Sequence, residues 1–179
     1  KHILVEKPMA SKVSQVKEIK ELADEKSLVA MVGHTFLFNS AVKYIKELID
    51  KNEIGDIRYI YCQRLNLGRI RNDVDALWNL APHDISIIQY WLNDPLPDQI
   101  TRNGSSFVQQ GIDDVVFLNI KYPNNIHANI HVSWLDPNKK RKITVVGSKK
   151  MIVYDDIADD KVTIFDKGID KMAVLGKGM

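Results

Sequence analysis

Two short apolar runs flanking an amphipathic segment open the chain, and they restrict its fold more than any other feature. Ile3–Val5 and residues 28–33 (LVAMVG) are apolar without alternation, as in strands buried on both faces. Strand, helix, strand in this order predicts a βαβ unit with a parallel sheet. The apolar side chains of the intervening helix fall on one face, and they are Val13, Val16, Ile19, Leu22 and Ala23.

The middle of the chain predicts two further helices and a strand. Ser40 opens a helix that Gly55 stops, and residues 57–65 form a strand candidate. A polar loop at 66–77 follows. A helix from about Asn79 to Leu92 then ends at Asn93-Asp94-Pro95.

After residue 96 the pattern changes to consecutive strand-like runs separated by turn residues. In residues 125–132, apolar and polar residues alternate, which is typical of a sheet with one buried face and one polar face. Short spacing favours antiparallel neighbours. The predicted runs are DDVVFLNIKY, NIHANIHVSWL, KRKITVVGS, KMIVYDD and DKVTIFDKG.

The predicted fold class is therefore α/β followed by α+β. Residues 1–35 would be the end of a doubly wound domain, and residues 36–179 a mixed, largely antiparallel sheet covered by helices. The chain starts directly before a strand, and only GKGM follows Ala173–Leu175. We therefore expect a fragment of a longer protein, cut within its second domain.

Composition narrows the classes of protein to consider. The 179 residues carry a formal charge of +2, which gives no reason to expect nucleic acid as a partner. No apolar stretch approaches the roughly 20 residues that span a bilayer. The single Cys62 excludes an intrachain disulfide framework, and a reducing, cytoplasmic setting fits best.

Lys7 is the first candidate functional residue, in the stretch VEKPMA. It follows the first strand, and in doubly wound sheets ligands bind beyond the carboxyl ends of the strands. Pro8 fixes φ directly after it, and a cis peptide bond there would re-aim the lysine. The alternative is a solvated lysine in a turn, which residue type alone favours.

His83 is the second candidate, in NLAPHDIS. If Asn79 caps the helix, Pro82 falls in the first turn and His83 near the helix N-terminus, where the dipole keeps the imidazole neutral. Asn79 and His83 would share a face. The alternatives are a half-buried, hydrogen-bonded histidine and a simple cap.

Two basic segments complete the candidates. In the loop at 69–75, arginines could bind phosphate or carboxylate groups, or could pair with neighbouring aspartates. Trp134 could stack on a ligand ring, and Lys139, Lys140 and Arg141 offer charge to a ligand. The alternative is an aromatic anchor of a hairpin with a basic turn, which we prefer for the lysines. His83, Asp84 and Asp73 lack a recognisable metal-ligand spacing, so we expect no metal site. The sequence contains no G-x-G-x-x-G turn for cofactor phosphates.

Three segments together resemble the Gfo/Idh/MocA family of NAD(P)-dependent sugar oxidoreductases: KHILVEKPMA, MVGHTFLFN and WNLAPHDISIIQYWL. The resemblance covers residues 1 to about 155. It implies that residues 1–35 are the C-terminal part of a dinucleotide-binding Rossmann domain. RIRNDVDALWNLAPHDIS and SWLDPNKKRKITVVGSKKMIVYDD look most similar to the UDP-N-acetyl-sugar 3-dehydrogenase branch.

The resemblance implies roles for individual residues in a full-length enzyme that uses NAD or NADP and a sugar or nucleotide-sugar substrate. Lys7 and His83 match the catalytic positions, with His83 as the base and Lys7 on the substrate oxygen, or with these roles exchanged. Glu6, Lys7 and Pro8 would lie on the cofactor side. The residues expected on the substrate side are His34, Asn39, Arg69, Asn72, Asp73, Asn79, Asp84 and Trp134, with Asn79 and Asp84 orienting His83.

The sequence also departs from the family pattern. Asn79 stands where the family often has aspartate, and an asparagine can orient a group but cannot take a proton. Ser40 stands where a proline is frequent. Since the phosphate-binding turn is missing, a non-catalytic module that forms oligomers or binds sugar nucleotides stays open as an alternative. The resemblance implies homo-oligomers formed through the C-terminal sheet.

Overall fold

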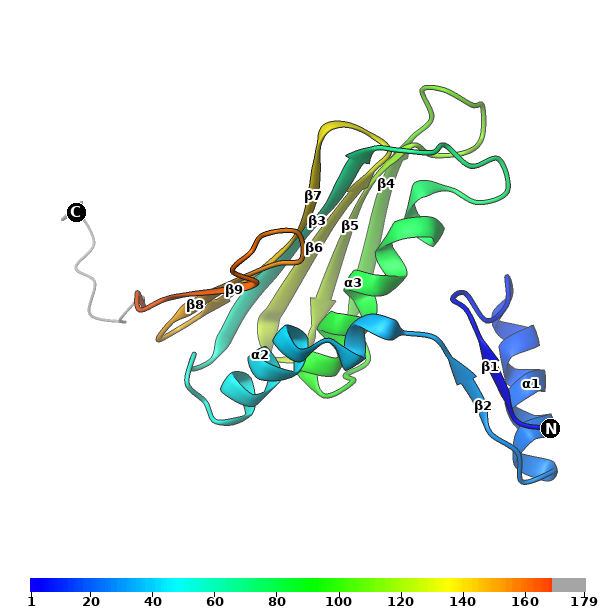
Figure 1. The fold of residues 1–179 in the computed structure, drawn as a ribbon, viewed down its shortest axis with the longest axis horizontal. Helices are drawn as coiled ribbons and strands as arrows, with labels where there is room; N and C mark the ends of the chain where they lie inside the picture. The colour runs from blue at the N-terminus through cyan, green and yellow to red at the C-terminus, as the bar shows by residue number, and fades with distance from the viewer. Residues whose placement is uncertain (169–179) are drawn as a thin grey trace.

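The computed structural model describes residues 1–168, which form a small βαβ unit and a larger layered α+β part (Figure 1). In the small unit, β1 (Ile3–Val5) and β2 (Ala30–Val32) pair in parallel, with Ile3 opposite Ala30. The helix α1 (Val13–Glu25) connects them. The predicted βαβ unit is confirmed. The Lys7–Pro8 peptide bond is cis.

The larger part contains a seven-stranded sheet with the order β4-β5-β6-β3-β7-β8-β9. At its centre β3 runs parallel to β6 and antiparallel to β7. All other neighbours in the sheet are antiparallel. The strands are β3 (Ile57–Leu67), β4 (Gln99–Ser105), β5 (Val115–Tyr122), β6 (Ile126–Ser133), β7 (Leu135–Gly147), β8 (Met151–Asp155) and β9 (Val162–Phe165).

Two helices, α2 (Ser40–Asp50) and α3 (Ala76–Leu92), lie on one face of this sheet (Figure 1). A short 3₁₀ helix, η1 (Thr35–Phe38), leads from β2 into α2, and η2 (Pro123–Asn125) joins β5 to β6. Ile45 of α2, Trp91 of α3 and Ile130 of β6 are fully buried in the layer between helices and sheet. The Trp91 indole donates a hydrogen bond to the carbonyl of Val42 at 3.0 Å, which links the two helices.

The alternation predicted for residues 125–132 is the reason why the sheet has two different faces. Ala128, Ile130 and Val132 are buried against the helices. In the described part of the chain, no helix covers the opposite face, where Tyr59 and Phe117 are exposed. The Phe117 ring stacks there on His131, with ring centroids 4.2 Å apart.

Three details of the predicted secondary structure were wrong. The helix α3 begins at Ala76, because Asp75 rather than Asn79 is its N-cap and accepts a hydrogen bond from the Trp78 amide at 2.8 Å. The helix α2 ends at Asp50, before Gly55, which adopts a positive φ of 70° in the turn that follows. Strand β4 was not predicted, since its residues are mostly polar and all of them are exposed along one edge of the sheet.

The consecutive strands β6 and β7 are not neighbours, because β3 from earlier in the chain lies between them. No helix within residues 1–168 is long and apolar enough to cross a membrane. The apolar run Ala173–Leu175 lies outside the described residues.

Candidate active site

A pocket of about 200 Å³ lies where the βαβ unit meets the helix-covered face of the large sheet. The loop after β1 contributes Lys7, and helix α3 contributes Asn79 and His83. Both residues matched to catalytic positions therefore line the same pocket. The complete lining is Lys7, Phe36, Arg64, Leu65, Asn66, Asn79, Leu80, His83, Lys139, Lys140 and Arg141.

Lys7 is fixed by a hydrogen bond that crosses from the βαβ unit to α3. Its Nζ donates to the backbone carbonyl oxygen of Asn79 at 2.5 Å. Pro82, inside this helix, lacks the amide that would bond the carbonyl of Trp78, and its ring presses on the preceding turn. A helix turn disturbed in this way leaves carbonyl oxygens accessible to other donors. Burial first, and then the charges of Arg64 and Arg71, lower the pKa of Lys7.

The side chain of Asn79 is held by Trp134. The indole Nε1 donates to Asn79 Oδ1 at 3.1 Å, and Trp134 is only 1% exposed. The structure therefore places Trp134 beneath the pocket, where it positions Asn79, and a stacking contact between its ring and a ligand is not available. Asn79 lies in the first turns of α3, one helical turn before His83, so the expected shared face is present.

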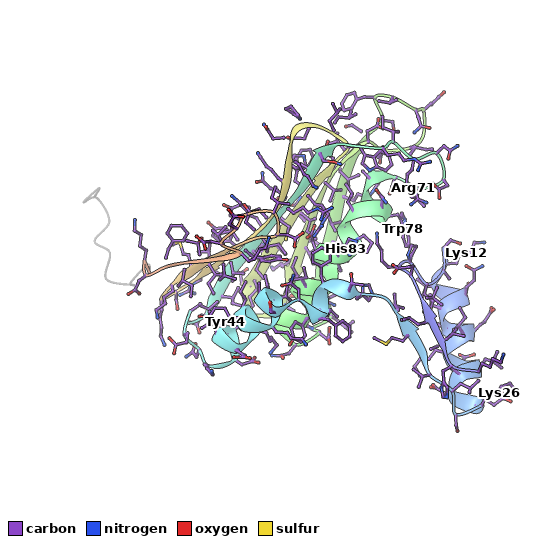
Figure 2. All side chains as sticks on the ribbon, in the orientation of Figure 1. Lys12, Lys26, Tyr44, Arg71, Trp78 and His83 are labelled. Carbon is purple, nitrogen blue, oxygen red and sulfur yellow. The ribbon has the colours of Figure 1, made fainter. Side chains whose placement is uncertain are left out.

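His83 occupies a buried and strongly positive environment. Its pKa is lowered from 6.5 to about 3, first by burial and then by the charges of Lys7, Arg64, His34 and Arg141. The predicted cause was the helix dipole, but α3 begins seven residues earlier and the field of the helix terminus has faded by His83. The ring packs against Phe36 with centroids 4.9 Å apart, and its Nδ1 is buried without a hydrogen-bond partner among residues 1–168. Figure 2 shows His83 and Trp78 on α3, with Arg71 in the loop before it.

The expectation that Asp84 orients His83 is corrected by the structure. Asp84 is buried and receives two hydrogen bonds from Arg64, from Nε at 3.0 Å and from Nη2 at 2.8 Å. Burial alone would lower the pKa of Arg64. Attraction and hydrogen bonding to the Asp84 carboxylate outweigh this effect of burial, so the pKa of Arg64 is raised. Arg64 also lies over the Phe36 ring, 4.9 Å from its centroid. Asp84 thus holds Arg64 in the pocket wall and acts on His83 only through this pair.

The polar loop before α3 forms a separate cavity. Arg69, Asn72 and Asp73 line a space of about 310 Å³ that does not include His83. Arg71 pairs with Asp73, with Nε donating to Oδ1 at 2.8 Å. The paired surface charges that the sequence left open as an alternative are therefore present. The structure does not bring Arg69, Asn72 or Asp73 into the pocket of Lys7 and His83.

The remaining predicted residues lie around the junction of the two parts. Asn39 is the N-cap of α2, and its Oδ1 accepts a hydrogen bond from the Ala41 amide at 2.9 Å. His34 lines a neighbouring apolar cleft of about 500 Å³ beside Trp78. Glu6, directly after β1, lies close to Gly33, directly after β2, and Pro8 follows Lys7 in the loop.

Sequence reasoning missed several residues that line the pocket. Arg64 and Asn66 come from β3, and pairing in the sheet brings them to the pocket. Phe36 comes from η1 and packs on the His83 ring. The buried Asn66 Oδ1 has no hydrogen-bond partner among residues 1–168. An arginine inside the apolar pattern of β3 was the signal that could have been used, because a buried arginine requires a partner.

Two family models match this chain, one over the βαβ unit and one over most of the larger part. Residues 1–34 match the oxidoreductase family with an NAD-binding Rossmann fold, and residues 42–153 match the GFO/IDH/MocA C-terminal domain. The chain belongs to the GFO/IDH/MocA family of oxidoreductases. It spans about half the length of the curated relatives it matches.

The names of individual relatives refer to chemically different compounds. The bovine trans-1,2-dihydrobenzene-1,2-diol dehydrogenase is 24% identical over 158 residues, which are 84% of this chain and 47% of that protein. An inositol dehydrogenase homolog from Azotobacter vinelandii, solved with NADH and myo-inositol, has a TM-score of 0.81 at 17% identity and covers 95% of this chain and 51% of its own. The structure of UDP-N-acetylglucosamine 3-dehydrogenase from Acidithiobacillus ferrooxidans matches with a TM-score of 0.80 at 21% identity. The match covers 94% of this chain and 55% of that protein. These structural likenesses show the fold.

The donor set of the pocket fits a hydroxyl or carbonyl group beside a nicotinamide. Lys7 supplies an ammonium donor, His83 a neutral ring nitrogen, and Asn66 an unpaired acceptor. Lys7 follows the carboxyl end of β1, where ligands of parallel sheets bind. In the described residues, no cluster of three His, Cys, Asp or Glu side chains could hold a metal ion.

Proposed function

We propose that the whole protein is an NAD(P)-dependent dehydrogenase that oxidises a hydroxyl group of a sugar, or reduces the corresponding ketone, with a nucleotide sugar as the favoured substrate. The observation that carries this proposal is the convergence of Lys7 and His83 on one pocket, from two separate family-matched segments. The resemblance of residues 69–86 and 133–156 to nucleotide-sugar dehydrogenases favours a nucleotide sugar.

His83 and Lys7 have complementary roles at the substrate hydroxyl, in which one accepts its proton and the other binds its oxygen. Because its pKa is lowered to about 3, His83 is neutral near pH 7 and able to accept a hydrogen bond from the hydroxyl. Lys7 has a lowered pKa from burial and from neighbouring arginines, which brings its amine closer to the range of a useful base. The hydroxyl proton passes to one of these two groups, and the other holds the oxygen in place.

The cofactor side of the site is assigned to Glu6, Lys7 and Pro8, directly after β1. When bound, the nicotinamide supplies the acceptor for a hydride from the sugar carbon. Asn79 acts as a positioning residue, because its carbonyl holds Lys7 and its side chain is held by Trp134. NAD and NADP are both compatible with these residues.

Replacement of His83 tests the proposal. In the whole enzyme, His83→Asn should lower kcat for NAD(P) reduction by about 10²- to 10⁴-fold, the usual contribution of acid–base catalysis, and should leave cofactor binding intact. His2→Asn is the matched control, since His2 is exposed at the start of the chain. Equal kcat values for His83→Asn and wild type would remove His83 from the mechanism.

A second role, in assembly, is favoured by the open face of the sheet. Tyr59, Tyr61 and Phe117 are exposed there side by side with polar residues of β6. We propose that this face packs against a second copy of the chain, as self-complementary patches do in symmetric dimers. Sedimentation of Phe117→Lys should show a smaller species than wild type. An unchanged sedimentation coefficient would contradict the assignment.

A further inference from the structure

The pocket around His83 has an uneven distribution of charge. Five basic side chains line it, and no Asp or Glu of residues 1–168 does so. Three of the five, Lys139, Lys140 and Arg141, come from β7. The sequence favoured a basic turn for the two lysines, and the structure places all three residues in the lining of the candidate active site.

The arginines of the pocket already have partners, whereas two lysines do not. Arg64 is paired with Asp84, and Arg141 Nη1 lies 3.2 Å from Asp156 Oδ2. Lys139 and Lys140 form no ion pair with any carboxylate in the part of the chain that the structure describes. Lys7 also lacks a carboxylate partner, but its Nζ is held by the Asn79 carbonyl, so Lys139 and Lys140 are the pocket lysines whose ammonium groups have no hydrogen bond or ion pair among residues 1–168.

An irregularity of β7 begins directly beside the two lysines. Lys140 pairs with Leu65 of β3, but the next paired residue of β7, Leu135, lies opposite Leu67. The residues in between have no partners in β3 and form a bulge, closed by a 3.0 Å hydrogen bond from the Asn138 amide to Asp136 Oδ1. Bulges of this kind re-aim side chains, and Lys139 and Lys140 lie at the end nearest to Arg141.

The interior of the pocket is neutral and polar by contrast. His83 Nδ1 and Asn66 Oδ1 are buried there without hydrogen-bond partners among residues 1–168. These atoms suit the hydroxyl groups of a substrate. The surrounding cations also depress the pKa of His83, so a negative charge at the rim would favour its protonated form.

We infer that the substrate carries an anionic group, a carboxylate or a phosphate, and that Lys139 and Lys140 bind it at the rim of the pocket while its hydroxyl groups face His83. This inference rests on the proposed dehydrogenase function for the identity of the reacting end. Two lysine ammonium groups form charge-assisted hydrogen bonds to such an anion and set specificity against neutral sugars.

Binding measurements without cofactor test the inference. The probes are glucose, glucuronate and glucose 1-phosphate, titrated into the whole protein by calorimetry. At least one anionic probe should bind about tenfold or more tightly than glucose, as expected for charge-assisted hydrogen bonds. Tighter binding of glucuronate identifies a carboxylate, and tighter binding of glucose 1-phosphate identifies a phosphate. Equal affinity for all three probes would overturn the inference.

A pair of double variants provides the matched control. Replacing Lys139 and Lys140 with glutamine should remove the preference for the anionic probe and flatten its dependence on salt. The same replacement of Lys149 and Lys150, in the turn between β7 and β8, changes the net charge equally but far from the pocket. Loss of the preference in both double variants would show a general charge effect and overturn the assignment to Lys139 and Lys140.

The protonation of His83 gives a second readout that does not depend on turnover. The groups that face it are Lys7, Arg64, His34 and Arg141, all of which lower its pKa. Titration by NMR should show that the anionic probe raises the pKa of His83 in the wild type, and less in the Lys139/Lys140 variant. An anionic preference without NAD(P) reduction would overturn only the proposed function. NAD(P) reduction with neutral sugars alone would overturn this inference and the preference for a nucleotide sugar, but would leave the dehydrogenase function standing.

Discussion

Lys7 Nζ donates a 2.5 Å hydrogen bond to the backbone carbonyl of Asn79, and this contact joins the βαβ unit to the helix that carries His83. The two residues are 72 positions apart in the sequence. Pro82 disturbs the turn that contains this carbonyl. The hydrogen bond therefore connects the candidate catalytic lysine directly to the backbone of the helix bearing the candidate catalytic histidine.

Replacement of Lys7 should separate its catalytic role from its structural one. Lys7→Met keeps the aliphatic stem and removes the donor, so we expect unfolding free energy to fall by about 1 kcal/mol. Turnover should fall much further, by about 10²-fold or more. Urea denaturation and NAD(P) reduction measure the two effects. Lys17→Met, on the exposed face of α1, is the control. A loss of turnover no larger than in Lys17→Met would contradict a catalytic role.

The buried pair of Arg64 and Asp84 should be the most sensitive ion pair of the pocket wall. Asp84→Ala leaves a guanidinium buried without its counter-charge, which costs about 3–5 kcal/mol of unfolding free energy. Asp73→Ala breaks the exposed pair with Arg71 and should cost less than about 1 kcal/mol. Chemical denaturation compares the two variants.

If Asp84→Ala fails to fold, the double variant Arg64→Met with Asp84→Leu tests whether the unpaired charge is the cause. Removing both charges leaves no unpaired ion in the core, so this protein should fold and unfold cooperatively. Equal small losses in Asp84→Ala and Asp73→Ala would show that the buried pair is not structurally important.

Stability should decrease as the pH falls below about 6.5. The folded protein holds His83 neutral, with a pKa of about 3, whereas an unfolded chain protonates it near 6.5. Below about pH 6.5 the unfolded state binds more protons than the folded state. The contribution of His83 to the unfolding free energy is therefore complete above about pH 6.5 and is lost as the pH falls toward 3. Burial lowers the pKa values of His34 and His131 as well, which adds to the same trend.

Denaturation between about pH 7 and about pH 5.5 stays above the range of most carboxylates and isolates the histidines. The slope of unfolding free energy against pH should be smaller in His83→Asn than in the wild type. Identical slopes would mean that the pKa of His83 is not lowered in the folded protein.

Asn79→Asp should change the protonation of His83. A carboxylate one helical turn away favours the imidazolium, so the pKa of His83 should rise above about 3. An NMR titration of the histidine ring measures this rise directly. Asn119→Asp places the same charge on the open face of the sheet and should leave the pKa of His83 unchanged. A shift of equal size in both variants would contradict the proximity of Asn79 to His83.

The βαβ unit and most strands were predictable because local patterns encode them. Continuous apolar runs identified β1 and β2, and alternation identified the buried face of β6. Strand β4 has no such signal, because all its residues are exposed at an edge. The insertion of β3 between β6 and β7 depends on pairing between distant segments, which local sequence does not contain.

The site was predictable only in part, because several of its residues are brought together by pairing between distant segments. The strand end and the helix start singled out Lys7 and His83, the resemblance matched them to catalytic positions, and the structure places both in one pocket. Arg64 and Lys139 enter that pocket through sheet register and a bulge, which no spacing in the sequence reveals. Asp84 was misinterpreted because its neighbour in sequence, His83, is not its partner in space.

The central claim, that Lys7 and His83 form the catalytic centre, is tested most directly by the structure of the whole protein with NAD(P) and a bound substrate. We predict that the nicotinamide lies beside Lys7 and that the reacting hydroxyl group contacts Lys7 and His83 in the pocket between β1, β3 and α3. A nicotinamide and substrate bound instead in the apolar cleft beside His34 and Trp78, out of contact with Lys7 and His83, would contradict the claim.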